Sequence, residues 1–110
     1  RMTERFSEDD VIIAVTRLTR SQLSRFVECE LVRPERSESG DIYRRVDIAR
    51  LELLCELSQD LDLDETALGI VILLIDQLHA ARQDLATMAR AIDTLPTDLQ
   101  ARIIAATKQP

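Results

Sequence analysis

The stretch from Asp64 to Leu95 constrains the fold most, because no proline interrupts it and its composition is strongly helical. Apolar residues recur along it in alternating steps of three and four, which is the spacing of a coiled-coil seam. The predicted seam is Leu68, Val71, Ile75, Leu78, Arg82, Leu85, Ala89 and Ile92, with Arg82 as its polar member. A helix of that length is on the order of 45 Å long, whereas a compact body of this chain length has a radius of gyration of about 13 Å. We therefore expect the helix to overhang its own domain and to need a partner.

The charge of the chain is unevenly distributed along the sequence. Residues 1–45 carry nine basic and nine acidic side chains, whereas residues 46–110 carry five and eleven, which accounts for the net charge of −6. An acidic surface repels phosphate backbones and attracts basic protein surfaces. Solubility alone explains an acidic helical surface equally well.

The composition argues against membrane and secreted classes. No apolar run approaches the roughly 20 residues that span a bilayer, and the N-terminus lacks a basic segment followed by an apolar one. Cys29 and Cys55 have no metal-ligand spacing, so we expect buried or half-buried thiols in a reducing cytosol, with a disulfide between them less favoured. The expectation is a cytoplasmic protein.

Two hydroxyl residues predict the first two helix starts. Ser7 is followed three residues later by a carboxylate and Thr19 by a glutamine, the pattern of a capping box. We expect a helix over about 8–15, with Phe6 packed against its first turn, and a second over about 20–30. The short connection at 16–18 makes the pair resemble a helix-turn-helix.

The rest of the chain predicts a hairpin and three further helices. Segments 31–36 and 42–46 are expected to be extended, and Ser, Gly and Asp in 37–41 form the turn between them. Asp47 is the expected N-cap of a third helix to about Leu61, and Asp64 that of the long helix. Pro96 ends the long helix, and a last helix follows to about residue 107, with Leu99, Ile103 and Ile104 on its apolar face. We divide the chain into a head, 1–61, and a helical part, 62–110, that form one compact unit.

This order of elements resembles the MerR-type winged helix-turn-helix. The residues that carry the resemblance are Leu31, Pro34, Arg36, Tyr43, Arg44, Asp47, Leu51, Leu61 and Leu63. The sequence departs from the MerR pattern at Ser24, where that pattern has arginine, at Arg25-Phe26 in place of an aromatic pair, and at Glu30 in place of glycine. The resemblance implies an all-α protein with a small β-hairpin wing, followed by a long helix of the dimerisation type.

A closer similarity is to the CbpM family of chaperone modulators. It rests on the small size, on Tyr43 before the third helix, and on the run Leu61–Asp64 leading into Gly69–Asp76. The similarity implies a regulator, not an enzyme, that inhibits a CbpA/DnaJ-like co-chaperone by occupying its J-domain. J-domains present a basic helix, so the expected binding residues are acidic: Asp60, Asp62, Asp64, Glu65 and Asp76. The predicted seam then serves a homodimer or, alternatively, is covered by the last helix of the same chain.

The runner-up hypothesis is a MerR-type transcriptional regulator. Its DNA contacts would come from arginines on or near the second helix and the wing: Arg17, Arg20, Arg25, Arg36 and Arg44, together with Arg33 and Arg45. Acidic residues in the same region leave it neutral, which opposes phosphate binding. Catalysis has little support, because His79 is the only histidine and no cofactor, metal or phosphate motif is present. We expect His79 to pack beside the seam.

Overall fold

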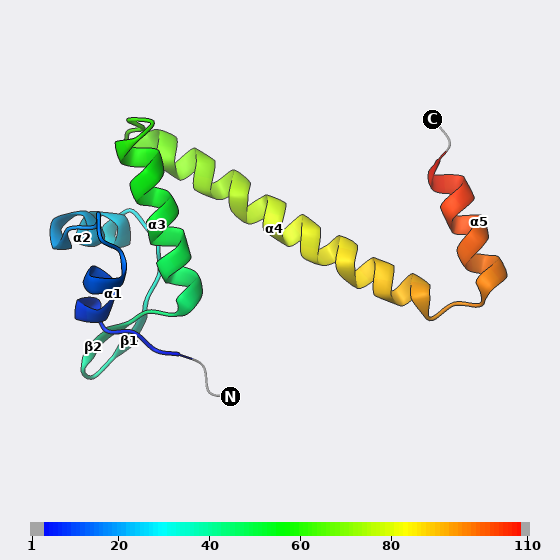
Figure 1. The fold of residues 1–110 in the computed structure, drawn as a ribbon, viewed down its shortest axis with the longest axis horizontal. Coiled ribbons are helices and arrows are strands. Elements are labelled where there is room, and N and C mark those ends of the chain that lie inside the picture. Colours follow the sequence, from blue (N-terminus) through cyan, green and yellow to red (C-terminus); the bar gives the residue numbers. More distant parts are fainter. Residues whose placement is uncertain (1–3, 109–110) are drawn as a thin grey trace. The chain divides into compact units, whose positions relative to one another are not determined.

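The computed structural model describes residues 4–108, which are mostly helical (Figure 1). In chain order the elements are α1 (Glu8–Ala14), α2 (Arg20–Glu28), β1 (Glu35–Ser37), β2 (Gly40–Ile42), α3 (Arg45–Gln59), α4 (Glu65–Asp93) and α5 (Thr97–Thr107). This order agrees with the prediction. The chain forms two compact units, one through Ile72 and one from Leu73, whereas the sequence suggested a division after residue 61. We call their described parts the N-terminal unit (4–72) and the C-terminal unit (73–108).

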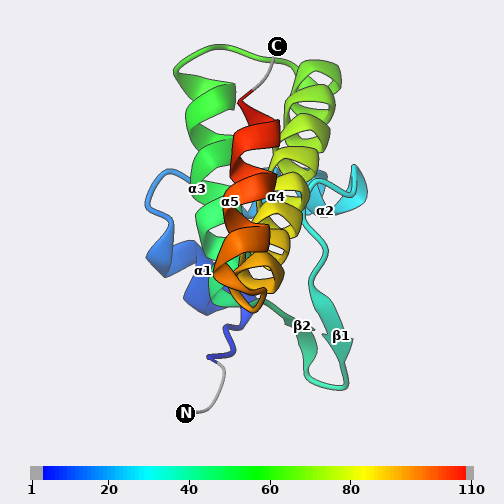
Figure 2. The same cartoon turned by 90° about the vertical axis from the view of Figure 1, so that its right-hand side faces the viewer.

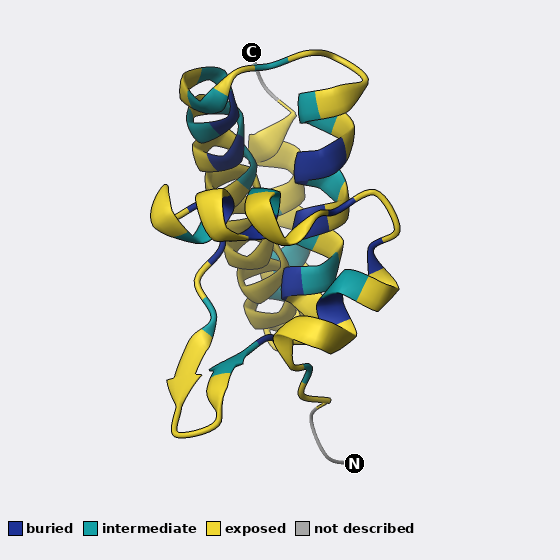
Figure 3. Cartoon of the chain, turned by 90° about the vertical axis from the view of Figure 1, so that its left-hand side faces the viewer, coloured by how far each residue is buried: buried dark blue, intermediate teal, exposed yellow. Residues whose placement is uncertain are grey.

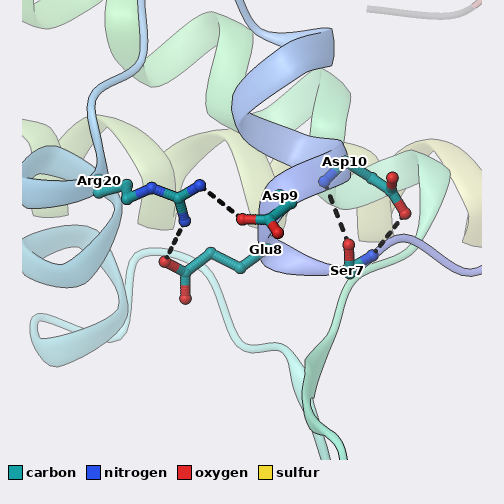
Figure 4. Close-up of polar contacts among 5 residues, drawn as sticks. All are labelled: Ser7, Glu8, Asp9, Asp10 and Arg20. Atoms are coloured by element: carbon teal, nitrogen blue, oxygen red, sulfur yellow. Dashed lines mark hydrogen bonds and ion pairs between the residues drawn. The ribbon is translucent and has the colours of Figure 1, made fainter.

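Both predicted capping boxes are present. The backbone N–H of Asp10 donates to Ser7 Oγ at 3.1 Å, and the N–H of Ser7 donates to Asp10 Oδ2 at 3.0 Å (Figure 4). Thr19 and Gln22 exchange the same two bonds at the start of α2, at 3.1 and 3.0 Å. Each box satisfies N–H groups that a first helical turn leaves without a partner, so local sequence fixes both helix starts.

Helix α2 ends two residues earlier than predicted, at a Schellman motif. Leu31 N–H donates to the carbonyl of Phe26, and Glu30 N–H donates to that of Val27. Glu30 sits between them with φ 60°, in the left-handed region. This is the position at which the MerR pattern has glycine, and the geometry gives the physical reason, since a side chain is disfavoured there.

Replacing Glu30 with glycine is expected to raise the free energy of unfolding by about 0.5–1 kcal/mol. The left-handed conformation costs a non-glycine residue roughly 1–2 kcal/mol, which exceeds the roughly 0.4–1 kcal/mol by which glycine stabilises the unfolded chain. The exposed pair of Glu30 with Arg33 contributes little. Urea unfolding of the full chain measures the change. Glu28→Gly, within α2, is the control and should destabilise by about 1 kcal/mol; a loss of stability in both variants would contradict the argument.

The hairpin is shorter than expected and is tied to the N-terminal segment. Strands β1 and β2 pair antiparallel, with Ser37 opposite Gly40, and Gly40 has φ +116°, which glycine adopts without steric cost. Beyond β2, Tyr43 and Phe6 exchange backbone hydrogen bonds of 2.7 and 2.8 Å. Phe6 also packs against the core. No local sequence pattern predicted this additional bridge.

Helix α3 begins earlier than predicted, and the assignment of Asp47 as its N-cap is wrong. Arg44 occupies the cap position, and Asp47 lies in the first turn, where its Oδ2 accepts the backbone N–H of Arg44 at 2.8 Å. Asp47 is 3% exposed and also pairs with the Arg44 side chain. A carboxylate at this third position still satisfies a free N–H at the helix start.

The core lies in the N-terminal unit, whose first two helices pack on one side of α3, with the hairpin beyond one end of α3 (Figures 1 and 2). Its buried apolar residues are Val11, Val15, Leu18, Leu23, Phe26, Leu31, Val32, Tyr43, Leu51, Leu54, Cys55, Leu68 and Ile72. The residues of the hairpin strands are exposed or half-buried (Figure 3). The first turns of α4 contribute Leu68 and Ile72, so they belong to this unit.

The C-terminal unit has no core of its own. None of its described residues is buried. Gln100 joins its two helices, because its Nε2 donates to the carbonyls of Asp93 and Leu95 at 3.2 and 2.9 Å. Beyond that junction, α5 leads away from the end of α4 (Figure 1), and the seam residues Leu78, Arg82, Leu85 and Ala89 are exposed.

Candidate interaction surfaces

The arginines of the DNA hypothesis each pair with a carboxylate of the same chain. The pairs are Arg17 with Asp60, Arg20 with Glu8 and Asp9, Arg25 with Glu65, Arg36 with Asp41, and Arg44 with Asp47. Figure 4 shows the guanidinium of Arg20 between its two partners. Arg33 and Arg45, named in the same hypothesis, pair with Glu30 and Glu4, and one further arginine, Arg5, pairs with Glu35.

These pairs leave the N-terminal unit strongly acidic. The unit carries nine arginines and sixteen carboxylates, a net charge of −7, whereas the C-terminal unit carries four basic and four acidic residues. The ninth arginine, Arg50, donates to the carbonyl of Leu31. Phosphate binding needs cationic groups that can replace the counterions of DNA, and in this unit each arginine already has a partner.

The residues predicted to form the acidic face have different local roles. Asp60 and Glu65 are taken up by arginines, and Asp64 caps α4, because its Oδ1 accepts the N–H of Ala67 at 2.9 Å. Asp62 is exposed in the loop, where it adopts a left-handed φ of 56°. Asp76 is exposed on α4 in the C-terminal unit. The loop therefore holds fewer uncompensated charges than its composition suggested.

The pair of Arg17 with Asp60 is bidentate. Two guanidinium nitrogens donate to the two oxygens of Asp60 at 2.8 and 3.2 Å, and Nε donates to Gln59 Oε1 at 2.8 Å. Gln59 in turn donates to the backbone carbonyl of Arg17. The hydrogen bond from Arg17 holds the pKa of Asp60 below its usual range. The α1–α2 connection is thereby fastened to the end of α3.

The residues of the predicted seam fall into three groups. Leu68 is 2% exposed inside the core of the N-terminal unit, so it is closed to a partner chain. Val71, Ile75 and Ile92 are half-buried, and Leu78, Arg82, Leu85 and Ala89 are exposed. Leu78 and Leu85 are 48% and 64% exposed, which is unusual for leucines one above the other on a helix.

A neighbouring register fits the exposed residues better. Starting at Leu74, steps of four and three give Leu74, Leu78, Ala81, Leu85, Met88 and Ile92, none of them polar. Leu74 and Met88 are 57% and 58% exposed. Sequence reasoning missed this register because it began at Leu68, and the signal that could have revealed it is the polar Arg82 in the chosen register.

The cysteines, the histidine and the tyrosine of the chain differ in burial. Cys55 is buried and free, as expected, and burial raises the pKa of its thiol. Cys29 is free but exposed at the end of α2, so the expectation that it is buried is wrong. His79 is also exposed. Burial raises the pKa of Tyr43 to about 12, which keeps this core phenol neutral.

Comparisons with protein-family models, curated proteins and solved structures found no match for this chain. Among the described residues, no helix is both long and apolar enough to cross a membrane.

Proposed function

We propose that this protein is a chaperone modulator with a MerR-like winged helix-turn-helix head that binds and inhibits the J-domain of a CbpA/DnaJ-like co-chaperone. One observation carries the proposal: the N-terminal unit has a net charge of −7, and each of its arginines already has a partner. Such a surface steers a basic helix toward it and repels a phosphate backbone. The motifs shared with CbpM supply the identity of the partner.

The proposal includes self-association through the C-terminal unit, forming a homodimer. This unit exposes a continuous apolar stripe, has no core and carries no net charge. A neutral apolar surface is not repelled by its own copy, whereas a basic partner would gain little from it. The face of α4 defined by Leu74, Leu78, Leu85 and Met88 is the proposed contact.

Two measurements on the purified chain test the function. We expect it to bind a full-length J-domain co-chaperone and to suppress the stimulation of Hsp70 ATPase activity by that co-chaperone. We also expect no shift of duplex DNA at physiological salt. Saturable DNA binding with a steep salt dependence, and no effect on the ATPase, would instead favour the MerR-type regulator.

A further inference from the structure

Helix α3 has a second face that the core does not use. Leu51 and Leu54 are completely buried, but Val46 on the same helix is 60% exposed. Ala49, Glu52 and Glu56 are also exposed, and Leu53 is half-buried. At 100° per residue these five positions lie together, away from the buried face. We call Val46, Ala49, Glu52, Leu53 and Glu56 the outer face of α3.

The side-chain carboxylates of Glu52 and Glu56 form no hydrogen bond or ion pair with the described residues. They stand one helical turn apart, at the edge of a hollow that Val15, Thr16, Arg17 and Cys55 also line. The one cation of that hollow, Arg17, is bound through both of its terminal nitrogens to Asp60. The charges of Glu52 and Glu56 are therefore available to a partner.

Other carboxylates of the N-terminal unit are less suited to hold a helix. Glu28, Glu38 and Asp62 also lack an ion pair, but they stand singly at the end of α2, in the hairpin turn and in the α3–α4 loop. On the outer face of α3, two charges lie beside an apolar strip formed by Val46, Ala49 and Leu53. This combination offers charge for steering and apolar area for affinity.

We propose that the outer face of α3 is the docking surface for a basic amphipathic helix, which under the proposed function is the basic helix of the J-domain. This proposal rests on the proposed function. It places the J-domain contact on α3, whereas the sequence analysis expected it mainly on the α3–α4 loop. Two basic side chains one turn apart on the partner match Glu52 and Glu56, and apolar side chains beside them cover Leu53, Ala49 and Val46. Helix-on-helix packing brings such rows together.

Charge reversal with a matched control tests the surface. The affinity of the chain for a full-length J-domain co-chaperone is measured for the wild type and two double variants, Glu52→Lys/Glu56→Lys and Glu28→Lys/Glu38→Lys. Both variants change the net charge equally. We expect the α3 variant to bind about tenfold more weakly or worse, and the control to stay within about threefold of wild type. Circular dichroism and light scattering verify fold and assembly.

An uncharged pair of variants tests the apolar part of the same surface. Val46→Ser should weaken binding several-fold, whereas Ile13→Ser, at a position 77% exposed on α1, should leave the affinity unchanged. Both side chains are exposed, so neither change empties the core.

The outcomes separate the surface from the function. One outcome is that the α3 double variant binds normally while Asp62→Lys/Asp64→Lys binds more weakly. The binding site would then lie on the α3–α4 loop, which overturns the proposed docking surface but not the proposed function. If the α3 double variant and the Glu28→Lys/Glu38→Lys control both bound the co-chaperone equally weakly, binding would depend on net charge alone. That result would overturn the proposed docking surface. A change of oligomeric state without a change of affinity would make a second copy the occupant of α3. Absence of binding by the wild-type chain would overturn the function and the surface together.

Discussion

Leu51→Ala is expected to lower the free energy of unfolding by about 3 kcal/mol, within the range of about 2–5 kcal/mol for leucine-to-alanine changes in cores. Leu51 is completely buried, at the centre of the α3 face that packs against the rest of the N-terminal unit. Removing its branched end leaves a cavity as well as losing buried apolar area. For a small domain that loss is a large part of the total stability.

Urea unfolding of the full chain, followed by circular dichroism, measures the effect. Leu61→Ala is the matched control, because it makes the same chemical change at a side chain that is 64% exposed. We expect the control to stay within about 0.5 kcal/mol of wild type. Similar losses in the two variants would show that the burial pattern described for α3 is incorrect.

Leu78→Asp is expected to convert the associated form of the chain to monomer. In the proposed homodimer this side chain lies in the apolar stripe of α4, and an aspartate there would be buried without a partner. We expect a loss of about 3 kcal/mol of association free energy or more, which is at least a hundredfold in the dissociation constant. Light scattering and sedimentation over a range of concentrations measure the change. Gln83→Asp, at an exposed position on another side of α4, adds the same charge and should leave association intact.

Adjacent positions distinguish the two registers of the stripe. Met88 belongs to the register that begins at Leu74, and Ala89 belongs to the register predicted from sequence. We therefore expect Met88→Asp to weaken association strongly and Ala89→Asp to weaken it much less. The core residues of the N-terminal unit are untouched by both changes, so its fold should persist. A folded dimer in both Leu78→Asp and Met88→Asp would place the interface elsewhere.

Local sequence was sufficient for the order of the elements and for several of their ends. Capping boxes and Asp64 as a cap were correctly predicted because each depends on residues within one helical turn. Pro34 and Gly40 similarly identified the hairpin region, although the strands are shorter than expected. The error at Asp47 arose because a carboxylate fits both the cap position and the third position of a helix.

The candidate sites were less predictable, because they depend on residues distant in the sequence. From the sequence alone, Arg17 and Arg25 were candidate DNA contacts. Asp60 and Glu65 were candidate contacts for a basic partner. Folding brings them together, so each charge compensates the other. Glu52 and Glu56 of α3 are among the carboxylates left without such a pair, and the sequence did not distinguish them from other surface glutamates.

The sequence by itself determined a chain of short capped helices, a hairpin and one long apolar helix, because caps, breakers and periodicity act over a few residues. Only the tertiary structure decided which side of that long helix is free. On one side of the first part of this helix, Leu68 and Ile72 are buried in the core. Further along the helix, the side chains of Leu74, Leu78, Leu85 and Met88 are exposed. Periodicity identifies an apolar stripe but not its neighbour, since burial is set by contacts between segments far apart in the chain.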